Sequence, residues 1–356
     1  MRFIGNKENL VEQIYQIMQS KNVTGRSFFD FFAGTTNVGQ FFKKQGYQVF
    51  SSDLLYFSFV LQKAYLATNE EPIFERLLAA LTIQNKSLFT DPLTQVVDYL
   101  NDLPLVEGFI YQNYTPEGSE SLQQPRMYFI GENGQKIDAI RQKIEEWQST
   151  NLINESEYFI LLACLIETVP FYANISGVYA AFQKMWDPRA IKKLVLRTIK
   201  IVEGKFDNQV YNDNSVNLIT KIQADILYLD PPYNHRQYAP NYHLLETIAK
   251  YDNPTIKGVA GLRPYEHQKS KFCNAQTALQ ELRKIAQNAN YKYLVLSYNS
   301  EGIMPQQKIM NILQQFGNLE LIEFDYLRFK SNSNGLSNTK KFVQEQLYLL
   351  TRKNEI

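Results

Sequence analysis

The chain has 356 residues, of which 44% are hydrophobic and 21% charged, and these proportions exclude a fibrous or a disordered protein. Its length exceeds that of one typical domain, so we expect a main domain with a second domain attached or inserted. Because 37 Lys and Arg residues face 36 Asp and Glu residues, the net charge of +1 excludes a strong overall positive field, and any contact with nucleic acid must come from local patches.

Residues 9–52 carry the pattern of a parallel β-sheet. Apolar residues over 9–18 recur at helical spacing and predict an amphipathic helix. An aromatic strand over 27–32 comes next, followed by a small-residue turn, a helix over 38–44 and a second strand over 47–51. This order of strand, helix and strand builds a parallel α/β sheet.

A different pattern, of longer helical stretches, occupies residues 66–199, and a polar loop with glycines over 115–134 interrupts it. We interpret this segment as an inserted, mainly helical domain, which leaves a discontinuous main domain formed by residues 1–65 and 200–356. Strand-like apolar segments return at 226–229, 293–297, 319–324 and 346–351, so the parallel sheet is expected to resume after the insertion.

Two carboxylates and a small-residue turn stand at the ends of the first two predicted strands. Asp30 ends the first strand, and Gly34 follows it in a turn where the missing Cβ lets a ligand approach the backbone. A carboxylate at a strand end can pair with a cationic amino group, and Asp53, after the second strand, is placed to accept hydrogen bonds from two ribose hydroxyls. Together they fit an adenosine with an amino-acid tail; a merely structural tight turn is the alternative.

The later strand over 225–229 ends abruptly in Asp230, Pro231, Pro232 and Tyr233. Prolines lack the N–H that a central strand needs, so the chain must leave the sheet at Asp230. A carboxylate, a backbone carbonyl and an aromatic ring are thereby placed at the carboxyl edge of the sheet, where open α/β folds bind ligands.

These groups suit methylation of an exocyclic amino group such as that of adenine, whose lone pair is delocalised into the ring. Asp230 and the Pro231 carbonyl would each accept one N–H bond and so favour a tetrahedral nitrogen whose lone pair points at a sulfonium methyl. Tyr233 would stack on the base, which has to be swung out of a duplex before it can react.

On these segments, the sequence resembles the D12 class of DNA adenine-N6 methyltransferases, the modification methylases of bacterial restriction systems. The tetrapeptide Asp-Pro-Pro-Tyr at 230–233 is the signature of that class, and residues 1–7 resemble its N-terminal segment. Phe32 and Gly34 match its glycine loop, from which Thr36 departs. The resemblance implies a Rossmann-like S-adenosylmethionine-dependent methyltransferase sheet with 66–199 as an inserted target-recognition domain, because the cofactor half precedes the insertion and the tetrapeptide follows it.

The resemblance also implies roles for individual residues. Asp213 would read the adenine amino group of the cofactor, and Lys7 would lie beside its methionine part. The S-adenosylmethionine site would comprise Phe3, Gly5, Lys7, Asp30, Phe32, Ala33, Gly34, Thr35, Asp53, Leu54, Asp213, Asn214 and Asp230. The catalytic residues would be Asp230, Pro231, Pro232 and Tyr233, and no metal ligand is expected.

Double-stranded DNA is the expected partner, and a cognate restriction endonuclease would act separately. The candidate DNA contacts are Arg189, Lys192, Lys193, Arg236, Tyr238 and Lys330. For the basic run over 186–205 a solvated helix face is the alternative, and for the Ser- and Asn-rich segment over 330–341 a solvated loop is the alternative. Ser297 and Asn299 are candidates for shaping the base pocket, or form a simple turn, and His243 is a candidate for packing a helix.

An N-terminus without an apolar signal segment and two widely separated cysteines indicate a bacterial cytoplasmic protein, and no apolar stretch is long enough to span a bilayer. Three alternative functions are considered. They are methylation of another amino group (cytosine N4, RNA adenine or protein glutamine), a non-catalytic module that binds cofactor or DNA, and an NAD-dependent oxidoreductase. The last is disfavoured because Thr36 stands where a dinucleotide loop would carry a second close glycine.

Overall fold

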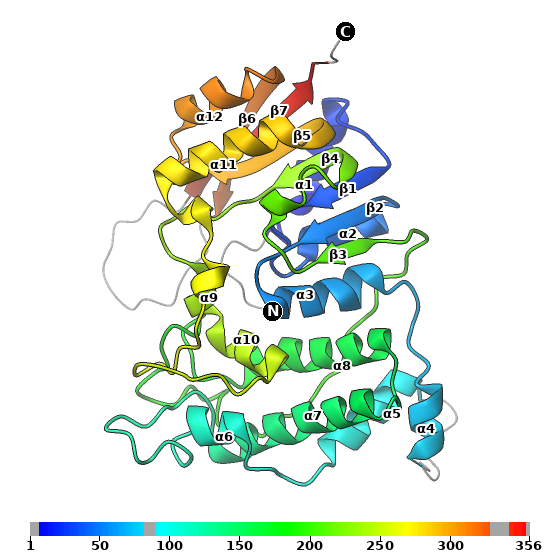
Figure 1. The fold of residues 1–356 in the computed structure, drawn as a ribbon, viewed down its shortest axis with the longest axis vertical. Helices are drawn as coiled ribbons and strands as arrows, with labels where there is room; N and C mark the ends of the chain where they lie inside the picture. Colours follow the sequence, from blue (N-terminus) through cyan, green and yellow to red (C-terminus); the bar gives the residue numbers. More distant parts are fainter. Residues whose placement is uncertain (1–6, 82–89, 328–341, 354–356) are drawn as a thin grey trace. The chain divides into compact units, whose positions relative to one another are not determined.

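The structure is a computed structural model and describes residues 7–81, 90–327 and 342–353. The chain divides into two compact units, one built around a β-sheet and one helical (Figure 1). The described residues of the sheet unit belong to Gly5–Gln62, Gly204–Tyr238 and His267–Ile356, and those of the helical unit to Lys63–Glu203 and Ala239–Glu266.

The helical unit contains the segment that the sequence predicts as an insertion over 66–199, but it also takes in Ala239–Glu266, which the sequence pattern assigns to the main domain. The reason is a set of buried contacts made by α10 (His243–Lys250). Arg141 donates from Nε to the carbonyl of Ile248 at 3.1 Å and from Nη2 to the carbonyl of Ala249 at 3.3 Å. The role of this unit in target recognition stays a prediction.

Within the described residues, seven strands form one sheet in the order β3-β2-β1-β4-β5-β7-β6. They are β1 (Ser27–Asp30), β2 (Gln48–Ser52), β3 (Gln209–Tyr211), β4 (Gln223–Leu229), β5 (Asn290–Asn299), β6 (Gly317–Leu327) and β7 (Phe342–Arg352). Strands β1 to β5 pair in parallel, which confirms the Rossmann-like α/β sheet. The expectation of a sheet that stays parallel is wrong at β7, which runs antiparallel between β5 and β6 because it pairs along its length with the strand that precedes it in the chain.

Helices cover both faces of this sheet (Figure 1). On one face lie α1 (Val11–Ser20), α2 (Asn37–Lys44) and α3 (Tyr56–Gln62), and on the other lie α11 (Ala275–Asn288) and α12 (Gln306–Leu313). Consecutive side chains on a strand point to opposite faces. Phe28 therefore stacks on Phe42 of α2, with ring centroids 3.6 Å apart, while Phe29 belongs to the core on the other side.

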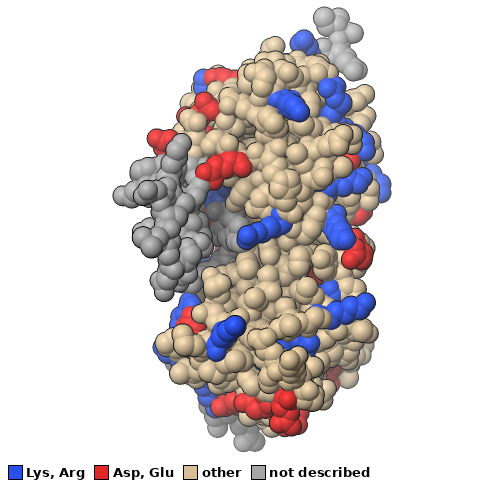
Figure 2. All heavy atoms as spheres, turned by 90° about the vertical axis from the view of Figure 1, so that its left-hand side faces the viewer, with Lys and Arg blue, Asp and Glu red and all other residues tan. Residues whose placement is uncertain are grey.

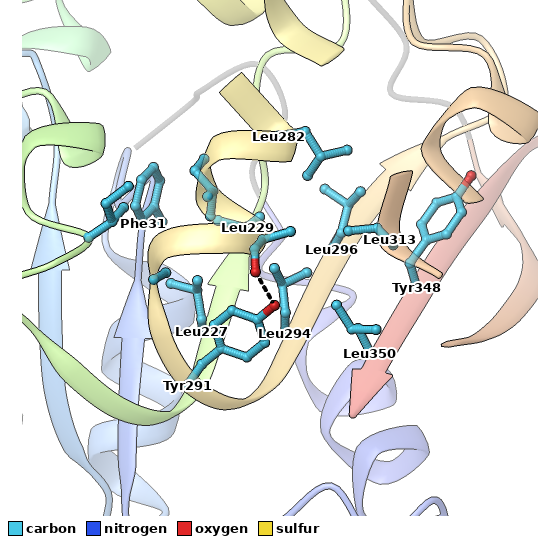
Figure 3. Close-up of a cluster of buried hydrophobic side chains, with 14 of the residues drawn as sticks. Phe31, Leu227, Leu229, Leu282, Tyr291, Leu294, Leu296, Leu313, Tyr348 and Leu350 are labelled. Atoms are coloured by element: carbon cyan, nitrogen blue, oxygen red, sulfur yellow. Dashed lines mark hydrogen bonds between the residues drawn. The ribbon is translucent and has the colours of Figure 1, made fainter. Parts of the chain in front are cut away.

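Figure 3 shows that second core, where strand side chains pack against α11 and α12. The labelled leucines and Phe31 are at most 2% exposed: Leu227, Leu229, Leu282, Leu294, Leu296, Leu313 and Leu350. Burial of each such side chain contributes about 1.5–3 kcal/mol to stability. The ends of β1 and β4 are therefore held firmly in place.

The helical unit contains α4 (Glu75–Ala80), α5 (Pro92–Asn101), α6 (Phe109–Tyr114), α7 (Gly131–Ser149), α8 (Glu155–Thr168) and α10. The short helix α9 (Tyr238–Asn241) begins at Tyr238, the last residue of the sheet-unit segment Gly204–Tyr238, and its other residues belong to the helical unit. The predicted loop over 115–134 is too long, because α7 already begins at Gly131. Gly134 allows α7 to pack closely against Thr115 at the end of α6, since an added Cβ would lie 2.4 Å from Cγ2 of Thr115. None of the described helices combines the length and apolar character that a bilayer crossing requires.

Candidate active site

The carboxyl ends of β1 and β4 lie side by side where the strand order reverses. From β1 the sheet continues through β2 to β3, and from β4 it continues in the other direction to β5. Asp30, the last residue of β1, is in register with Tyr228, two residues before Asp230. Ligands of open α/β sheets bind at such a point. The two carboxylates that the sequence identifies therefore stand where a ligand would bind.

Asp30 is a buried carboxylate with one hydrogen-bonded oxygen and, in the described part of the chain, one oxygen without a partner. It is 1% exposed, and its Oδ2 accepts a hydrogen bond from the N–H of Gly39, in the first turn of α2, at 3.2 Å. Its Oδ1 is buried and has no hydrogen-bond partner within the described residues. Burial, and next the nearby carboxyl of Asp230, raise the pKa of Asp30 to about 7. A buried oxygen of this kind suits a ligand that brings a cationic donor.

The turn between β1 and α2 contains two residues in the left-handed region of φ. Gly34 has a φ of +50°, and its N–H donates to Oδ2 of Asp53 at 2.9 Å. Thr36 has a φ of +65°, which glycine adopts more readily than threonine. Its Oγ1 accepts a hydrogen bond from Nε2 of Gln40 at 2.9 Å. Thr36 thus keeps a glycine-like backbone and adds a contact to α2.

Asp53 and Asp213 lie on connected loops at the ends of β2 and β3. The second oxygen of Asp53, Oδ1, accepts from the N–H of Leu55 at 2.9 Å, and the backbone carbonyl of Asp53 accepts from Nδ2 of Asn212 at 3.0 Å. Oδ1 of Asp213 accepts from the N–H of Asn214 at 2.6 Å. The carboxylates expected to bind a ribose and an adenine are therefore fixed by local hydrogen bonds.

The other predicted cofactor residues also belong to these loops. Thr35 is 6% exposed and accepts a hydrogen bond from Nδ2 of Asn37 at 3.2 Å, and the N–H of Ala33 donates to the carbonyl of Ser52 at 3.0 Å. Phe32 packs edge-on against Phe272, and the carbonyl of Leu54 accepts from Nε2 of Gln268 at 3.2 Å. Phe3 and Gly5 lie outside the described residues.

Lys7 lies between two carboxylates. Its Nζ is 2.5 Å from Oε1 of Glu345 on β7 and 3.6 Å from Oδ1 of Asp230. Ser297 of β5 donates from Oγ to the same oxygen of Glu345 at 2.6 Å. Burial alone would lower the pKa of Lys7, but the charges of Asp230 and Glu345 raise it above its ordinary value. The Lys7 ammonium therefore stays charged inside the site.

Asp230 has an oxygen ready to accept a hydrogen bond. Its side chain is 15% exposed, and its Oδ1 is buried with no hydrogen-bond partner within the described residues. Burial raises the pKa of Asp230 to about 7; Lys7 acts to lower it and Glu345 to raise it. Near neutral pH this carboxyl is thus able to accept or release a proton.

The segment after Asp230 is anchored to the sheet unit. Pro231 is buried, and Tyr233 is partly buried against the core of Figure 3, with its carbonyl accepting from the N–H of Ile303 at 3.1 Å. Gln237 exchanges two hydrogen bonds with the backbone of Ser270, at 2.7 and 3.0 Å. This anchoring fixes the backbone from which the aromatic ring projects.

Sequence reasoning missed two residues that face Asp230. Tyr228 precedes it by two positions in β4, so the alternation of a strand places both side chains on one face. The hydroxyl of Tyr228 is buried without a hydrogen-bond partner within the described residues, and burial followed by the charge of Asp230 raises its pKa well above the ordinary value. Glu345 could have been noticed as the one acidic residue of β7, just before the apolar run over 347–350.

The other residues singled out in the sequence differ in how far they are buried. Ser297 is fully buried and donates to Glu345, and its role in shaping the base pocket stays a prediction. His243 is also fully buried, with its Nε2 2.9 Å from the carbonyl of Tyr179, which fits a packing role. Arg236 is exposed, and Lys330 lies outside the described residues.

Comparison with known proteins decides the family. The model of the D12 class of N6 adenine-specific DNA methyltransferases matches residues 3–312. The chain belongs to this class. Membership confirms the resemblance drawn from the Asp-Pro-Pro-Tyr tetrapeptide, and an NAD-dependent oxidoreductase is excluded. The activity, the substrate and the roles of individual residues stay predictions.

This chain is similar to several modification enzymes. It is 43% identical to Type II methyltransferase M.FokI of Planomicrobium okeanokoites over 337 residues, which are 93% of this chain and 50% of M.FokI. It is 37% identical to Modification methylase StsI of Streptococcus sanguinis over 99% of this chain and 52% of StsI. With Type II methyltransferase M.NlaIII of Neisseria lactamica it shares 38% identity over 99% of both chains. This chain thus spans about half the length of M.FokI and StsI and nearly all of M.NlaIII.

Proposed function

We propose that this chain transfers a methyl group from S-adenosylmethionine to N6 of an adenine in a specific double-stranded DNA sequence, as a site-specific adenine methyltransferase. The observation that carries the proposal is the environment of one oxygen, Oδ1 of Asp230. This oxygen is buried at the carboxyl edge of the sheet and has no hydrogen-bond partner within the described residues. An amino group that donates an N–H to it would satisfy it and would lie at the switch point of the sheet.

The loops around Asp30 and Asp53 fit S-adenosylmethionine. Oδ1 of Asp30 would accept from the ammonium group of its methionine part, which would also satisfy a buried oxygen. Asp53, whose oxygens accept the N–H groups of Gly34 and Leu55, would also accept hydrogen bonds from the ribose hydroxyls. The remaining oxygen of Asp213 would accept from the adenine amino group. When bound, this cofactor supplies an electrophilic methyl carbon.

The residues of the tetrapeptide would orient the substrate nitrogen. Asp230 and the carbonyl of Pro231 would each accept one amino hydrogen, which directs the nitrogen lone pair away from the base ring. Asp230 would then take up the proton that the nitrogen loses, because its pKa of about 7 lets it hold and release a proton near neutral pH. Tyr233 would stack on the flipped base, and Pro232 would help to end the strand at this point.

Replacing Gly34 by Ala is expected to lower the free energy of unfolding by about 1–2 kcal/mol, because a Cβ at positive φ crowds the following carbonyl. The same Cβ is expected to obstruct the cofactor, so affinity for S-adenosylhomocysteine should also fall. Thermal unfolding and calorimetric titration measure the two effects.

Gly46 provides the matched control for Gly34. Its φ is +82°, and an added Cβ would meet no heavy atom within 4 Å. Gly46→Ala is therefore expected to lose similar stability and to keep its affinity for the cofactor. Equal affinities in the two variants would remove the Gly34 turn from the cofactor site.

Two fully buried asparagines form hydrogen bonds to the backbone of an irregular basic segment of the helical unit, residues 183–194. Nδ2 of Asn174 donates to the carbonyl of Gln183 at 3.0 Å, and its Oδ1 accepts from the N–H of Asp187 at 2.9 Å. Nδ2 of Asn133 donates to the carbonyl of Lys192 at 2.9 Å, and its Oδ1 accepts from the N–H of Leu194 at 2.8 Å. The segment is not helical, so the solvated helix face is not the correct alternative here.

This segment presents cations that suit DNA phosphates. Lys192 is exposed, and Arg189 and Lys193 form exposed or partly exposed ion pairs with Asp187 and Glu132. Such pairs contribute little to stability and can be exchanged for phosphate. Figure 2 shows Lys and Arg side chains spread singly over the face that it draws. The cations of this rigidly held segment are therefore a better basis for DNA contact than the overall charge of the protein.

Lys192→Ala is expected to weaken DNA binding about tenfold at low salt and to reduce the slope of log affinity against log salt by about one. Lys308→Ala, an exposed lysine of α12, serves as the control and is expected to leave both quantities unchanged. Fluorescence anisotropy with a duplex oligonucleotide at several salt concentrations measures them. Identical salt slopes for both variants would exclude a phosphate contact by Lys192.

The names of the relatives support a place in a restriction-modification system, with a cognate endonuclease acting separately. Sequencing that detects modified bases, applied to host DNA with and without this gene, tests the proposal. N6-methyladenine within one short sequence is the expected result. Modified cytosine, or DNA unchanged by an expressed and folded protein, would overturn it.

A further inference from the structure

Glu345 is a buried acidic residue beside Asp230 that has no part in the chemistry described so far. It lies in β7 opposite Asn299 of β5 and is 3% exposed. An ionised carboxylate is costly to bury unless it is paired and hydrogen-bonded. Its Oε1 accepts hydrogen bonds from both the ammonium of Lys7 and the hydroxyl of Ser297. Glu345 is therefore fixed in direction as well as neutralised.

The two carboxylates hold Lys7 at unequal distances. Nζ lies 2.5 Å from Oε1 of Glu345, a charge-assisted hydrogen bond, and 3.6 Å from Oδ1 of Asp230, which is beyond hydrogen-bond range. Ser297 orients the nearer acceptor. As a result Oδ1 of Asp230 has a positive charge close by and, among the residues that the structure describes, no donor that occupies it.

We propose that Glu345 is a positioning residue, which holds the Lys7 ammonium short of Asp230 so that Oδ1 of Asp230 stays open to the amino group of the substrate. The inference rests on the proposed role of Asp230. Without the charge of Glu345, Lys7 would close on Asp230 and occupy the oxygen that the substrate amine needs. The ammonium would then compete with the substrate rather than support its acceptor.

The groups that face Asp230 set the sign of the expected pH effect. They are Lys7 before α1, Asp30 of β1, Tyr228 of β4 and Glu345 of β7, and Tyr233 lies near Lys7. Burial raises the pKa of Asp230 most, Lys7 lowers it, and Glu345 raises it. Loss of the Glu345 charge and closer approach of Lys7 would both favour the ionised form of Asp230.

Glu345→Gln tests the inference, because the amide keeps an oxygen acceptor for Ser297 and removes only the charge. We expect kcat to fall about tenfold to a hundredfold while KM for DNA and cofactor affinity stay close to wild type. We also expect the acidic limb of the kcat profile to move to lower pH by about one unit. Glu345→Asp retains the charge and should restore the wild-type limb and part of the rate. A limb that does not move in Glu345→Gln would overturn the inference.

Two further variants separate positioning from loss of stability. Glu281 is a second buried glutamate with lysine partners, Lys271 and Lys284, and Glu281→Gln should change the melting temperature without moving the limb. Lys7→Met should move the limb to higher pH, opposite to Glu345→Gln, because Lys7 is the group that lowers the pKa of Asp230. A wild-type protein that does not methylate DNA would refute the proposed function, whereas an active wild type with unchanged pH profiles in Glu345→Gln and Lys7→Met would refute this inference alone.

Discussion

Asp230→Asn is expected to slow methyl transfer about a thousandfold, because an amide cannot take up the proton that the substrate nitrogen loses and presents a donor to it on rotation. Cofactor affinity should change less than tenfold, because Asp30 and Asp53 carry most of the polar contacts that fit the cofactor. Transfer of a radiolabelled methyl group to duplex DNA gives the rate, and calorimetric titration gives the affinity.

Loss of fold cannot explain such a result. The carboxyl of Asp230 has its pKa raised by burial to about 7, above the value of an unfolded chain, so its ionised form destabilises the folded protein above that pH. Asp230→Asn should therefore be at least as stable as wild type at pH 8. Near-normal turnover in this variant would contradict the role assigned to Asp230.

Asp30→Asn is expected to weaken cofactor binding about tenfold to a hundredfold, which corresponds to loss of one charge-assisted hydrogen bond. The same variant should gain stability in the absence of cofactor at high pH. The folded-state pKa of Asp30 is about 7, above the unfolded value, so the folded protein binds more protons between about pH 4 and 7 and loses stability as pH rises through that window. Asp30→Asn should remove roughly 1 to 4 kcal/mol of this decline.

Asp225 gives a control of opposite sign at the other end of the same strands. Burial acts to raise its pKa, but the N–H groups of Arg26 and Ser27 and the Ser27 hydroxyl hold it below its ordinary value. Its contribution to stability is therefore present above the unfolded pKa and is lost as pH falls through the folded one. Asp225→Asn should lose stability at pH 8 and keep cofactor affinity. If Asp30→Asn behaves like Asp225→Asn in denaturant titrations and calorimetry, the cofactor assignment of Asp30 is wrong.

Local chemistry made the two strand ends predictable. The prolines after Asp230 forced the chain out of the sheet, and the small residues after Asp30 required a turn; the structure places both carboxylates at the switch point. A period of two would also have put Tyr228 on the face of Asp230. These features depend on a few consecutive residues, so a single sequence contains them.

Contacts across long separations were not predictable. Glu345 meets Lys7 across 338 positions, and only the pairing of β7 with β5 brings it there. The antiparallel direction of β7 likewise follows from its pairing with β6 and not from its apolar pattern. Ala239–Glu266 joined the helical unit through buried hydrogen bonds from Arg141, for which the sequence gives no periodic signal.

The measurement that tests the central claim most directly is mass spectrometry of nucleosides after incubation of the purified protein with unmethylated duplex DNA and isotope-labelled S-adenosylmethionine. The account predicts the label in N6-methyldeoxyadenosine, and in no nucleoside when Asp230→Asn replaces the wild-type protein. Label in N4-methyldeoxycytidine, or equal labelling of adenine by the variant, would contradict it.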